Sequence, residues 1–340
     1  MRVRIIFWVV PLLVFAACLM RPPAVAVAYQ EKPVTGNYEV VRHWPVIPDG
    51  VFLGQVAGVD VDSHNHVFIF QRGSDRNSLT KPPAPLERVK EPAILVFDGE
   101  TGRLITQWGA NQFVRPHGLT IDHEDNVWLT DNSLHQVFKF SHDGRLLMTL
   151  GKAGEPGSDE SHFNAPTDVA ILPDGTFYVA DGYGNNRVVN FSRDGRVLKV
   201  WGGEQRGDGP GQFDLPHCID ADDQGHIYVA DRTNKRIQIF DRDGKFLSEW
   251  KNLGWGVPYA IKVKNGLRLI ADGGDLPGRV NRSSVFLVDE NGHIESSFGR
   301  WGRYDGEFDV AHDLAVGKDG SVYVVDVLGQ RVQKFSQRKP

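Results

Sequence analysis

The sequence has very few cysteines. Its 340 residues include only Cys18 and Cys218, and Cys18 lies in an N-terminal segment that we expect to be removed. One remaining thiol cannot close an intramolecular disulfide, so the stability of the fold must come from a hydrophobic core and from any bound metal. We expect Cys218 to be a small buried residue that points into its sheet rather than a metal ligand.

The sequence also lacks an uninterrupted apolar run of the ~20 residues that a membrane-spanning helix needs. The apolar stretch from Ile5 to Met20 is shorter and contains Pro11. It follows a basic start and precedes Ala26-Val27-Ala28, which has the small-x-small pattern of a cleavage site. We therefore predict a signal peptide over residues 1–28 and a flexible tail over 29–37. The mature chain is then expected to be exported to the periplasm, the extracellular space or a secretory lumen.

An alternative for the N-terminus is a lipid anchor. Ala16-Ala17-Cys18 resembles the end of a lipoprotein cleavage box, and processing there would attach the chain to a membrane through Cys18. Phe15 argues against this alternative, because such boxes favour a smaller aliphatic residue at that position. We expect membrane attachment only if Cys18 is lipidated.

Positive charge is not in excess. The chain carries 38 Lys and Arg residues against 43 Asp and Glu residues. Removal of residues 1–28 would take away Arg2, Arg4 and Arg21 and leave a net charge of about −8. No cluster of Lys and Arg stands out, and nucleic acid binding relies on a basic surface. The composition therefore argues against nucleic acid as a partner.

What the sequence does contain is an internal repeat. Six segments align with one another, and each has apolar runs with period-two alternation between Asp-Gly-like turns, which is typical of β-hairpins. The copies begin at Gly54, Phe113, Phe163, Phe213, Gly256 and Phe308. A copy reads as four short strands, the pattern of one propeller blade. The repeat therefore predicts an all-β, six-bladed β-propeller over residues 38–336.

Closure of the ring also has a trace in the sequence. The sixth copy supplies three strands before Pro340. The segment from Tyr38 to Trp44 alternates like a strand and precedes the first copy, so we expect it to be the missing outer strand. Pairing this N-terminal strand with the last blade closes the ring and removes exposed edges. The repeat pattern as a whole resembles the NHL family.

Histidine recurs at one position of the repeat. The innermost strand of each blade lines the central channel, and there His117, His217 and His312 occupy alternate blades, with Thr167 and Tyr259 between them. Alternate blades of a six-fold ring lie about 120° apart, so three imidazoles converge and leave a fourth position open. A catalytic zinc requires three protein ligands and an open position. The alternative is that these histidines are polar channel residues bonded to water.

Three further polar residues lie at strand ends that face one mouth of the channel. Arg72 ends the second strand of the first copy, Arg232 follows Asp231 in the fourth, and Tyr183 lies near that place in the third. Arginine binds carboxylates through its planar guanidinium group, so these residues can face a substrate. For any one of them alone, the alternative is a salt bridge or other contact with a neighbouring blade. The repeated aspartates at these strand ends are expected to be structural; they are Asp131, Asp181, Asp231 and Asp326.

From about Trp44 to Phe335 the chain resembles the peptidyl-α-hydroxyglycine α-amidating lyases. The resemblance rests on the stretches GQVAGVDVDSHNHVFIFQRG, PHGLTID, LHQVFKF, PGSDESHFNAPTDVA, VADGYGNNRVV, GQFDLPH, VADRTNKRIQ and AHDLAV. It implies zinc on His117, His217 and His312. It also implies a structural calcium ion on the carbonyls of Val59 and Leu119 and the carboxylate of Asp313, oxygen ligands of the kind that calcium prefers.

The resemblance further implies a reaction. Members of this family act on a peptide ending in α-hydroxyglycine and cleave its C–N bond to give a peptide amide and glyoxylate. Zinc would polarise the substrate oxygen, and Tyr183 would act as general base, assisted by the positive charges of Arg232 and the metal. Arg72 would hold the substrate carboxylate or stabilise developing charge. We expect a monomer whose partner is a small peptide or an α-hydroxyglycine-type amide.

One departure and two alternatives bear on this interpretation. Val310 stands where the family has a methionine, which puts the shape of the substrate pocket in question. The first alternative is a non-catalytic NHL propeller that binds a protein or peptide and keeps a structural metal. The second is a lactonase-like hydrolase, whose usual acidic and Asn ligands the ring of histidines does not match. Because fold alone does not decide function, the choice depends on the geometry around the histidines.

Overall fold

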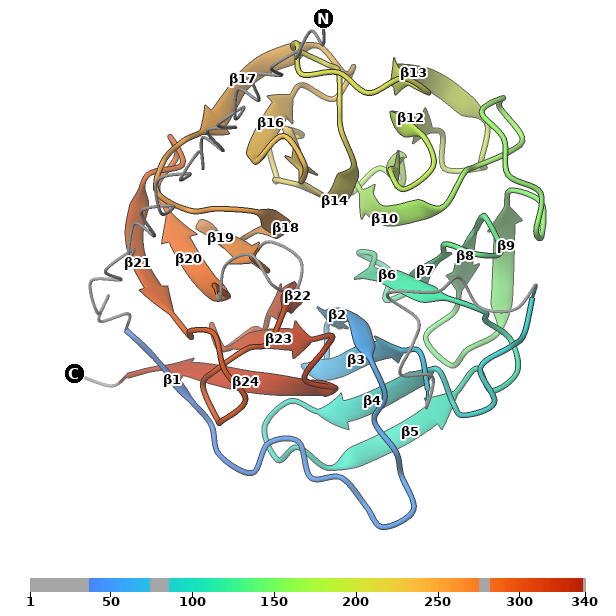
Figure 1. Ribbon diagram of the computed structural model, residues 1–340. Helices are drawn as coiled ribbons and strands as arrows, with labels where there is room; N and C mark the ends of the chain where they lie inside the picture. Colours follow the sequence, from blue (N-terminus) through green and yellow to red (C-terminus); the bar gives the residue numbers. More distant parts are fainter. Residues whose placement is uncertain (1–36, 74–85, 275–281, 339–340) are drawn as a thin grey trace, which may run out of the picture. The chain divides into compact units, whose positions relative to one another are not determined.

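The computed structural model describes residues 37–73, 86–274 and 282–338. In these residues the chain forms six four-stranded antiparallel sheets arranged around a central axis (Figure 1). The predicted six-bladed all-β propeller is thereby confirmed. The predicted signal peptide, the tail up to residue 36 and Cys18 lie outside the described residues. Within the described ranges, no helix is long and apolar enough to cross a membrane.

The first three blades follow one another along the chain, and each runs in sequence order from the axis to the rim (Figure 1). Blade one consists of β2 (Val56–Val61), β3 (His66–Gln71), β4 (Ile94–Asp98) and β5 (Leu104–Trp108). Blade two consists of β6 (Pro116–Ile121), β7 (Val127–Asp131), β8 (Gln136–Phe140) and β9 (Leu146–Leu150). Blade three consists of β10 (Pro166–Ile171), β11 (Phe177–Asp181), β12 (Asn186–Phe191) and β13 (Val197–Gly203).

The remaining blades repeat the arrangement, except that the last one takes its outer strand from the N-terminal side. Blade four consists of β14 (Pro216–Ala221), β15 (Ile227–Asp231), β16 (Arg236–Phe240) and β17 (Phe246–Lys251). Blade five consists of β18 (Pro258–Lys264), β19 (Leu267–Asp272), β20 (Ser284–Val288) and β21 (Ile294–Phe298). Blade six consists of β22 (Ala311–Val316), β23 (Val322–Asp326), β24 (Arg331–Gln337) and β1 (Tyr38–Val40).

The N-terminal strand closes the ring, as the sequence predicts. Strand β1 pairs antiparallel with β24, with Tyr38 opposite Gln337 and Val40 opposite Phe335. The predicted extent to Trp44 is wrong, because β1 ends at Val40. His43 has a φ of 64°, which is incompatible with an extended strand. Trp44 instead packs into the core with its ring 4.8 Å from that of Tyr323.

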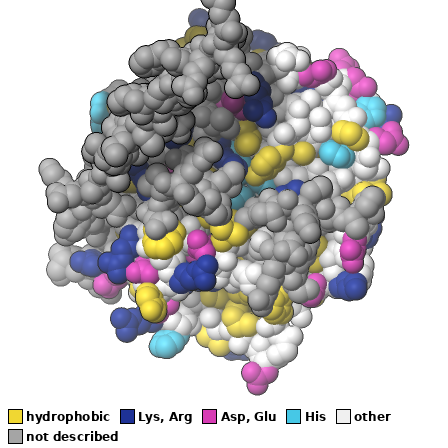
Figure 2. Space-filling model, viewed as in Figure 1, with side chains coloured by type: hydrophobic (Ala, Val, Ile, Leu, Met, Phe, Trp, Pro, Cys, Tyr) yellow, Lys and Arg dark blue, Asp and Glu magenta, His cyan; other side chains and the backbone are white. Residues whose placement is uncertain are grey.

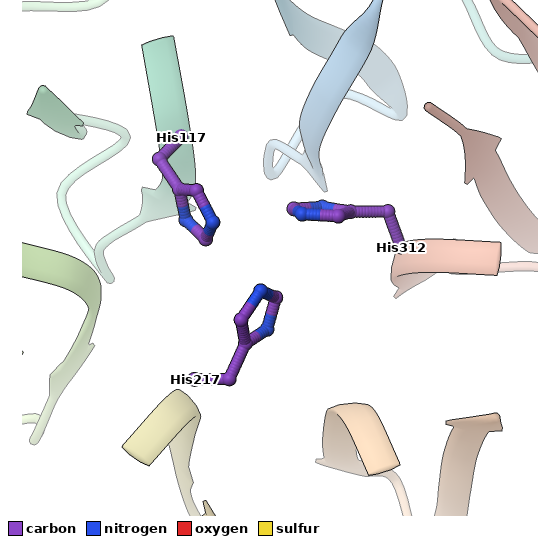
Figure 3. A group of neighbouring side chains, drawn as sticks. All are labelled: His117, His217 and His312. Carbon is purple, nitrogen blue, oxygen red and sulfur yellow. The ribbon is translucent and has the colours of Figure 1, made fainter. Parts of the chain in front are cut away.

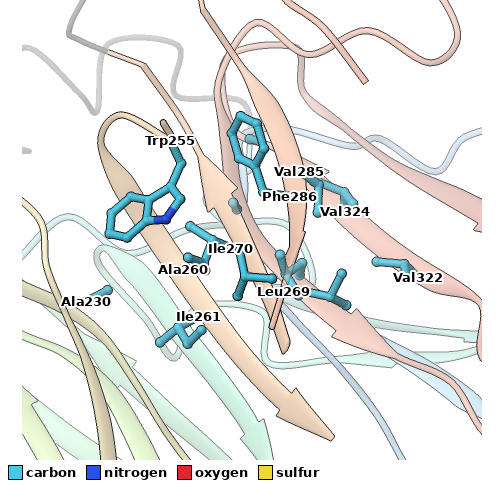
Figure 4. Packing of buried hydrophobic residues seen from close by; sticks show 14 of the residues in the cluster. Ala230, Trp255, Ala260, Ile261, Leu269, Ile270, Val285, Phe286, Val322 and Val324 are labelled. Carbon is cyan, nitrogen blue, oxygen red and sulfur yellow. The ribbon is translucent and has the colours of Figure 1, made fainter. Parts of the chain in front are cut away.

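The hydrophobic core lies between the blades. The inner strands are covered on both faces, so every residue of β2 is buried, whereas β9 at the rim is mostly exposed or half-exposed. One cluster joins three blades: Ala230 of blade four, Ile261 of blade five and Val322 of blade six belong to it (Figure 4). Because each sheet packs against its neighbours in this way, the inner strands hold fixed positions around the axis.

A buried ion pair anchors the loop that enters the inner strand of blade four. Arg236 is 1% exposed and donates from Nε to Asp231 at 2.7 Å and from Nη1 to Glu249 at 2.8 Å. It also donates to three loop carbonyls, those of Asp208, Gly209 and Gln212. Removing one partner of a buried pair leaves an uncompensated charge, which is more costly than losing an exposed pair.

We therefore predict that Arg236→Met lowers the free energy of unfolding by roughly 3–5 kcal/mol. The matched control is Arg242→Met, because Arg242 forms an exposed ion pair with Asp174 close to the same strand. That substitution should cost less than about 1 kcal/mol. Urea denaturation of the three proteins measures both values, and equal losses for the two variants would contradict the prediction.

Candidate functional site

One residue of each inner strand is placed toward the channel by a β-bulge. In blade four, for example, Pro216 pairs with Asp231 and Cys218 pairs with Ala230, so His217 is left out of the ladder. The bulge position in the six blades is Ala57, His117, Thr167, His217, Tyr259 and His312. A bulged residue can turn its side chain out of the alternation of the strand. The repeat position that carries the histidines is thus the one at which the strand bends.

The three histidines of this ring converge on one point (Figure 3). The ring centroids of His117, His217 and His312 are 4.8 to 4.9 Å apart, an almost equilateral arrangement. Their ligand nitrogens all lie within 4.8 Å of one another, and each side chain is at most 3% exposed. In the space-filling view, histidine and Lys or Arg side chains are visible near the centre of the face (Figure 2). The triad is therefore a group that can hold a metal ion.

Each imidazole is held by the backbone of the next blade. Nδ1 of His117 lies 2.8 Å from the carbonyl oxygen of Thr167, and Nδ1 of His312 lies 2.7 Å from that of Ala57. Nδ1 of His217 lies 2.7 Å from the carbonyl oxygen of Tyr259. Because a carbonyl only accepts, Nδ1 must carry the hydrogen and Nε2 keeps a lone pair directed at the axis. Backbone orientation of this kind is typical of metal-binding histidines.

Gly118 makes this contact possible. A Cβ atom at position 118 would lie 2.5 Å from the carbonyl oxygen of Thr167, which is the same oxygen that accepts the hydrogen bond from His117. A side chain here would force blades two and three apart. The sequence motif His117-Gly118 therefore supplies both a ligand and the close backbone approach that orients it.

Burial keeps the triad uncharged. Loss of solvent lowers the pKa of His117 and His217 well below 6.5 and that of His312 to about 3, and the nearby guanidiniums of Arg72 and Arg232 lower these pKa values further. A neutral imidazole is the form that binds a metal. The three imidazoles can therefore bind a metal ion at neutral pH without first losing a proton.

The same shift predicts a pH dependence of stability. Below pH 6.5 the unfolded chain takes up a proton at His312, whereas the folded protein resists protonation down to about pH 3. The free energy of unfolding must then fall as the pH falls through this window. Between about pH 7.5 and 5.5 we expect the metal-free wild type to lose roughly 1 kcal/mol relative to His312→Asn. Urea midpoints at both pH values test this, and an equal change in the two proteins would contradict it.

Tyr183 stands directly over the triad. Its hydroxyl lies 3.1 Å from Nε2 of His217 and 3.3 Å from Nε2 of His117. Arg232 donates from Nη1 to this hydroxyl at 3.3 Å, and its guanidinium lies 4.2 Å from the ring centroid of Tyr259. Tyr183 is 39% exposed, so this residue borders the solvent while its hydroxyl contacts two of the buried histidines.

Arg72 also lies close to the triad. It is 3% exposed and donates from Nε to the carbonyl of Pro116 at 2.8 Å, next to His117 in the chain. Its charge contributes to the lowered pKa of His117 and His312. The structure therefore brings Arg72, Tyr183 and Arg232 to the same place, although each comes from a different blade.

The buried aspartates at the ends of the second strands fix the start of the inner strands. Asp131 accepts hydrogen bonds from the backbone N–H groups of Val114 and Arg115, and Asp326 accepts from that of Val310. These contacts hold the loop just before His117 and just before His312. The aspartates have the structural role that the repeat predicts, and they hold the loops that precede the histidines of the triad. Val310 packs with Tyr259 in a small apolar cluster beside the channel.

A second group of acidic residues lies below the triad. Asp313 accepts the N–H group of Val59 at 3.0 Å, and Leu119 lies on β6, which packs beside β2. Burial and the neighbouring Asp168 raise the pKa of Asp313, while the Lys262 ammonium lowers it. Asp168 and Lys262 lie near Asp313, but the repeat pattern of the sequence did not indicate either residue as a functional position. Cys218 is buried here too, and its thiol donates to the carbonyl of Ile261, in keeping with a structural role.

Comparison with known proteins places this site in a family. The NHL repeat family model matches residues 163–191 and 213–240. Peptidyl-glycine alpha-amidating monooxygenase B of Xenopus laevis is 39% identical over 87% of this chain, which spans about a third of that protein (35%). Among solved structures, a streptogramin B lyase superposes with a TM-score of 0.54 at 14% identity, covering 84% of this chain and 95% of that one. This last likeness concerns the fold alone.

Two shorter relatives match over most of their length. NHL repeat-containing protein 3 of Homo sapiens is 32% identical over 88% of this chain and 84% of that protein. Peptidyl-alpha-hydroxyglycine alpha-amidating lyase 2 of Drosophila melanogaster is 32% identical over 86% of this chain and 73% of that protein. Given this similarity and its NHL propeller fold, the chain belongs to the peptidyl-α-hydroxyglycine α-amidating lyase family.

Proposed function

We propose that this protein is a zinc-dependent lyase that cleaves the C–N bond of a peptidyl-α-hydroxyglycine, or of a related α-hydroxy amide, to an amide and glyoxylate. One observation carries the proposal: three Nε2 lone pairs meet in the channel directly beneath the hydroxyl of a partly exposed tyrosine. A purely structural metal would not need a titratable group held over its ligands. Membership of the amidating lyase family supports the same reaction.

The donor set fits zinc. Three neutral imidazoles with an open fourth position are the protein ligands of a catalytic zinc site, and Nδ1 of each ring is already fixed by a carbonyl. Zinc bound by His117, His217 and His312 would supply a Lewis acid for the substrate oxygen.

The surrounding side chains have the roles that the reaction needs. Tyr183 is placed to take the proton of the substrate hydroxyl. The electron pair of that O–H bond then forms the C=O bond of glyoxylate, the C–N bond breaks, and the nitrogen takes up a proton as it leaves as the amide. Arg232 holds the Tyr183 hydroxyl through Nη1. Arg72 adds positive charge next to His117, where it favours the carboxylate of the substrate.

A calcium ion below the triad is part of the proposal. Asp313 and Asp168 are buried carboxylates, and burial raises the pKa of both. The negative charge of Asp168 raises the pKa of Asp313 further. A divalent cation on Asp313 and on the carbonyls of Val59 and Leu119 would offset this charge with the oxygen ligands that calcium prefers. It would join blades one, two and six, and so hold His117 and His312 in place.

The proposal is tested by the release of glyoxylate from a peptide with C-terminal α-hydroxyglycine. The purified protein should form glyoxylate, lose this activity when a zinc chelator removes the metal, and regain it on addition of Zn²⁺ but not of Ca²⁺ alone. Absence of glyoxylate from protein shown to contain zinc would exclude the reaction. The alternative of a non-catalytic propeller that binds a peptide through a structural metal would then be favoured.

Export by removal of residues 1–28 and a monomeric state remain parts of the proposal. The N-terminal residue of the protein recovered from the producing cell tests the first, because cleavage after Ala28 would leave Tyr29 at the start. Sedimentation of the purified chain tests the second.

A further inference from the structure

A second group of histidines lies away from the channel, where blade one meets blade two. Asp62 follows β2, His64 and His66 lie in and just after the turn to β3, and His142 lies in the turn between β8 and β9. Oδ2 of Asp62 is 2.9 Å from Nδ1 of His66, 2.7 Å from Nε2 of His142 and 3.9 Å from Nδ1 of His64. The ligand atoms of Asp62, His64 and His142 all lie within 4.8 Å of one another. We call these four residues the seam cluster.

The seam cluster is separate from the histidines of the channel. Asp62 stands five positions after Ala57, the bulge residue of blade one. At 3.3 Å per strand residue this is about 16 Å along β2. The cluster therefore lies at the opposite end of the inner strand, and no residue is shared with the triad.

The next two seams of the propeller, between blades two and three and between blades three and four, have an ion pair at the equivalent place. The residue equivalent to His142 is Arg193 in blade three and Arg242 in blade four. Arg193 forms an ion pair with Glu124 of blade two, and Arg242 forms one with Asp174 of blade three. Arginine is always charged and cannot bind a metal, whereas a neutral imidazole can. Between blades one and two, a histidine that can bind a metal therefore stands where the next two seams have a permanently charged arginine.

Part of the seam cluster is a general feature of the turn between the first two strands of a blade, and part of it is additional. An aspartate with a histidine four residues later also occurs as Asp222 and His226 in blade four, with Nδ1 and Oδ2 2.9 Å apart. The pair of Asp62 and His66 is therefore a feature of the repeat turn. The two histidines His64 and His142 are additions to it, and they approach the same carboxylate from two blades.

The geometry suits an ion with tetrahedral coordination. Oδ1 of Asp62 accepts hydrogen bonds from the backbone N–H groups of His64 and His66, at 2.8 and 2.7 Å. The other oxygen, Oδ2, therefore faces the imidazoles. A tetrahedral zinc ion with bonds of 2.0–2.1 Å has ligand atoms about 3.3 Å apart, within the 2.7 to 3.9 Å range around Oδ2. The side chain of Asp62 is fully buried, whereas those of His64 and His142 are 65% and 43% exposed, so an ion can enter from solvent.

We propose that Asp62, His64 and His142 form a second metal site, selective for zinc and similar first-row divalent ions, that joins blade one to blade two. His66 is hydrogen-bonded to the carboxylate of Asp62 beside this site. Imidazole and carboxylate together suit these ions, whereas calcium and magnesium prefer oxygen ligands alone. Asp125 of blade two lies next to the site. Its carboxylate accepts a hydrogen bond from the hydroxyl of Ser63 and lies 3.6 Å from Nδ1 of His64. The site stands independently of the lyase function.

The test is a titration of the metal-free full-length protein with Zn²⁺ in competition with a chromophoric chelator. His142→Arg introduces the residue that the next two seams carry, so the fold is expected to be kept. Loss of a direct ligand should lower the Zn²⁺ affinity of one class of site at least tenfold. The rate of glyoxylate formation should not change. His64→Asn, which removes an exposed side chain, should have the same effect.

The matched control is His226→Asn, which alters the same turn in a blade without the two additional histidines. Its titration should equal that of the wild type. If the channel triad does not bind zinc, the wild type should still show the one class of site that His142→Arg removes. Identical zinc titrations of wild type, His142→Arg and His64→Asn would overturn the proposal.

Discussion

Replacing His217 with alanine is expected to reduce kcat/KM for glyoxylate formation about a thousandfold. The substitution removes one of the three imidazoles whose ligand nitrogens converge in the channel, and with it, under the proposed mechanism, the Lewis acid of the reaction. A metal ion contributes several kcal/mol to the stabilisation of a transition state, and about 4 kcal/mol corresponds to a factor of a thousand in rate. The zinc content of the protein, measured by atomic emission, should fall together with the activity.

The control for this experiment lies in the same blade. His226→Asn removes a half-exposed histidine from the turn after β14, where it contacts Asp222, and it should leave kcat/KM within a factor of about two. Thermal unfolding of both variants shows whether either has lost its fold. Full activity of His217→Ala without bound zinc would rule out a role of the triad in the reaction.

The second large effect is expected for Tyr183→Phe. This substitution keeps the ring that packs against His117 and His217 and removes only the hydroxyl. Loss of a positioned general base lowers kcat by roughly 10²- to 10⁴-fold. Because Tyr183 is not one of the three imidazole ligands, the zinc content should stay at the wild-type level. Retained metal with lost turnover would separate the chemistry of the tyrosine from that of the metal.

Tyr304→Phe is the matched control, because Tyr304 is 81% exposed and lies outside the channel ring. It should leave both kcat and KM unchanged. If Tyr183→Phe also turned over substrate at the wild-type rate, another group would have to take the proton. A rise in KM alone would instead assign Tyr183 to substrate binding.

The blade pattern and the ring of histidines follow from the sequence because both are periodic. Alternating apolar runs define the strands, and a repeat puts equivalent residues at equivalent places around the axis. Once His117, His217 and His312 are aligned in the repeat, their convergence needs no knowledge of side-chain contacts. The closing strand follows in the same way, although its end at Val40 depends on the backbone conformation of His43.

The contacts that make the ring a site are not periodic in the sequence. The bulge at His217 shows only in the pairing of β14 with β15. The carbonyl that orients His312 belongs to Ala57, 255 residues away, and nothing in the local sequence of either residue indicates the other. The seam cluster is a similar case, since Asp62 and His142 are 80 residues apart and neither alone differs from an ordinary turn residue.

The sequence by itself determined the propeller, the order of its blades and the three histidine positions of the candidate metal site, because hydrophobic periodicity and repeat phase can be read along the chain. Only the tertiary structure decided which imidazole nitrogen faces the axis, that Tyr183 lies over two of the three histidines, and that three histidines of two blades gather around Asp62. These properties depend on how neighbouring sheets pack at distances of about 3 Å between polar atoms, and such packing is set by the whole ring rather than by any one repeat.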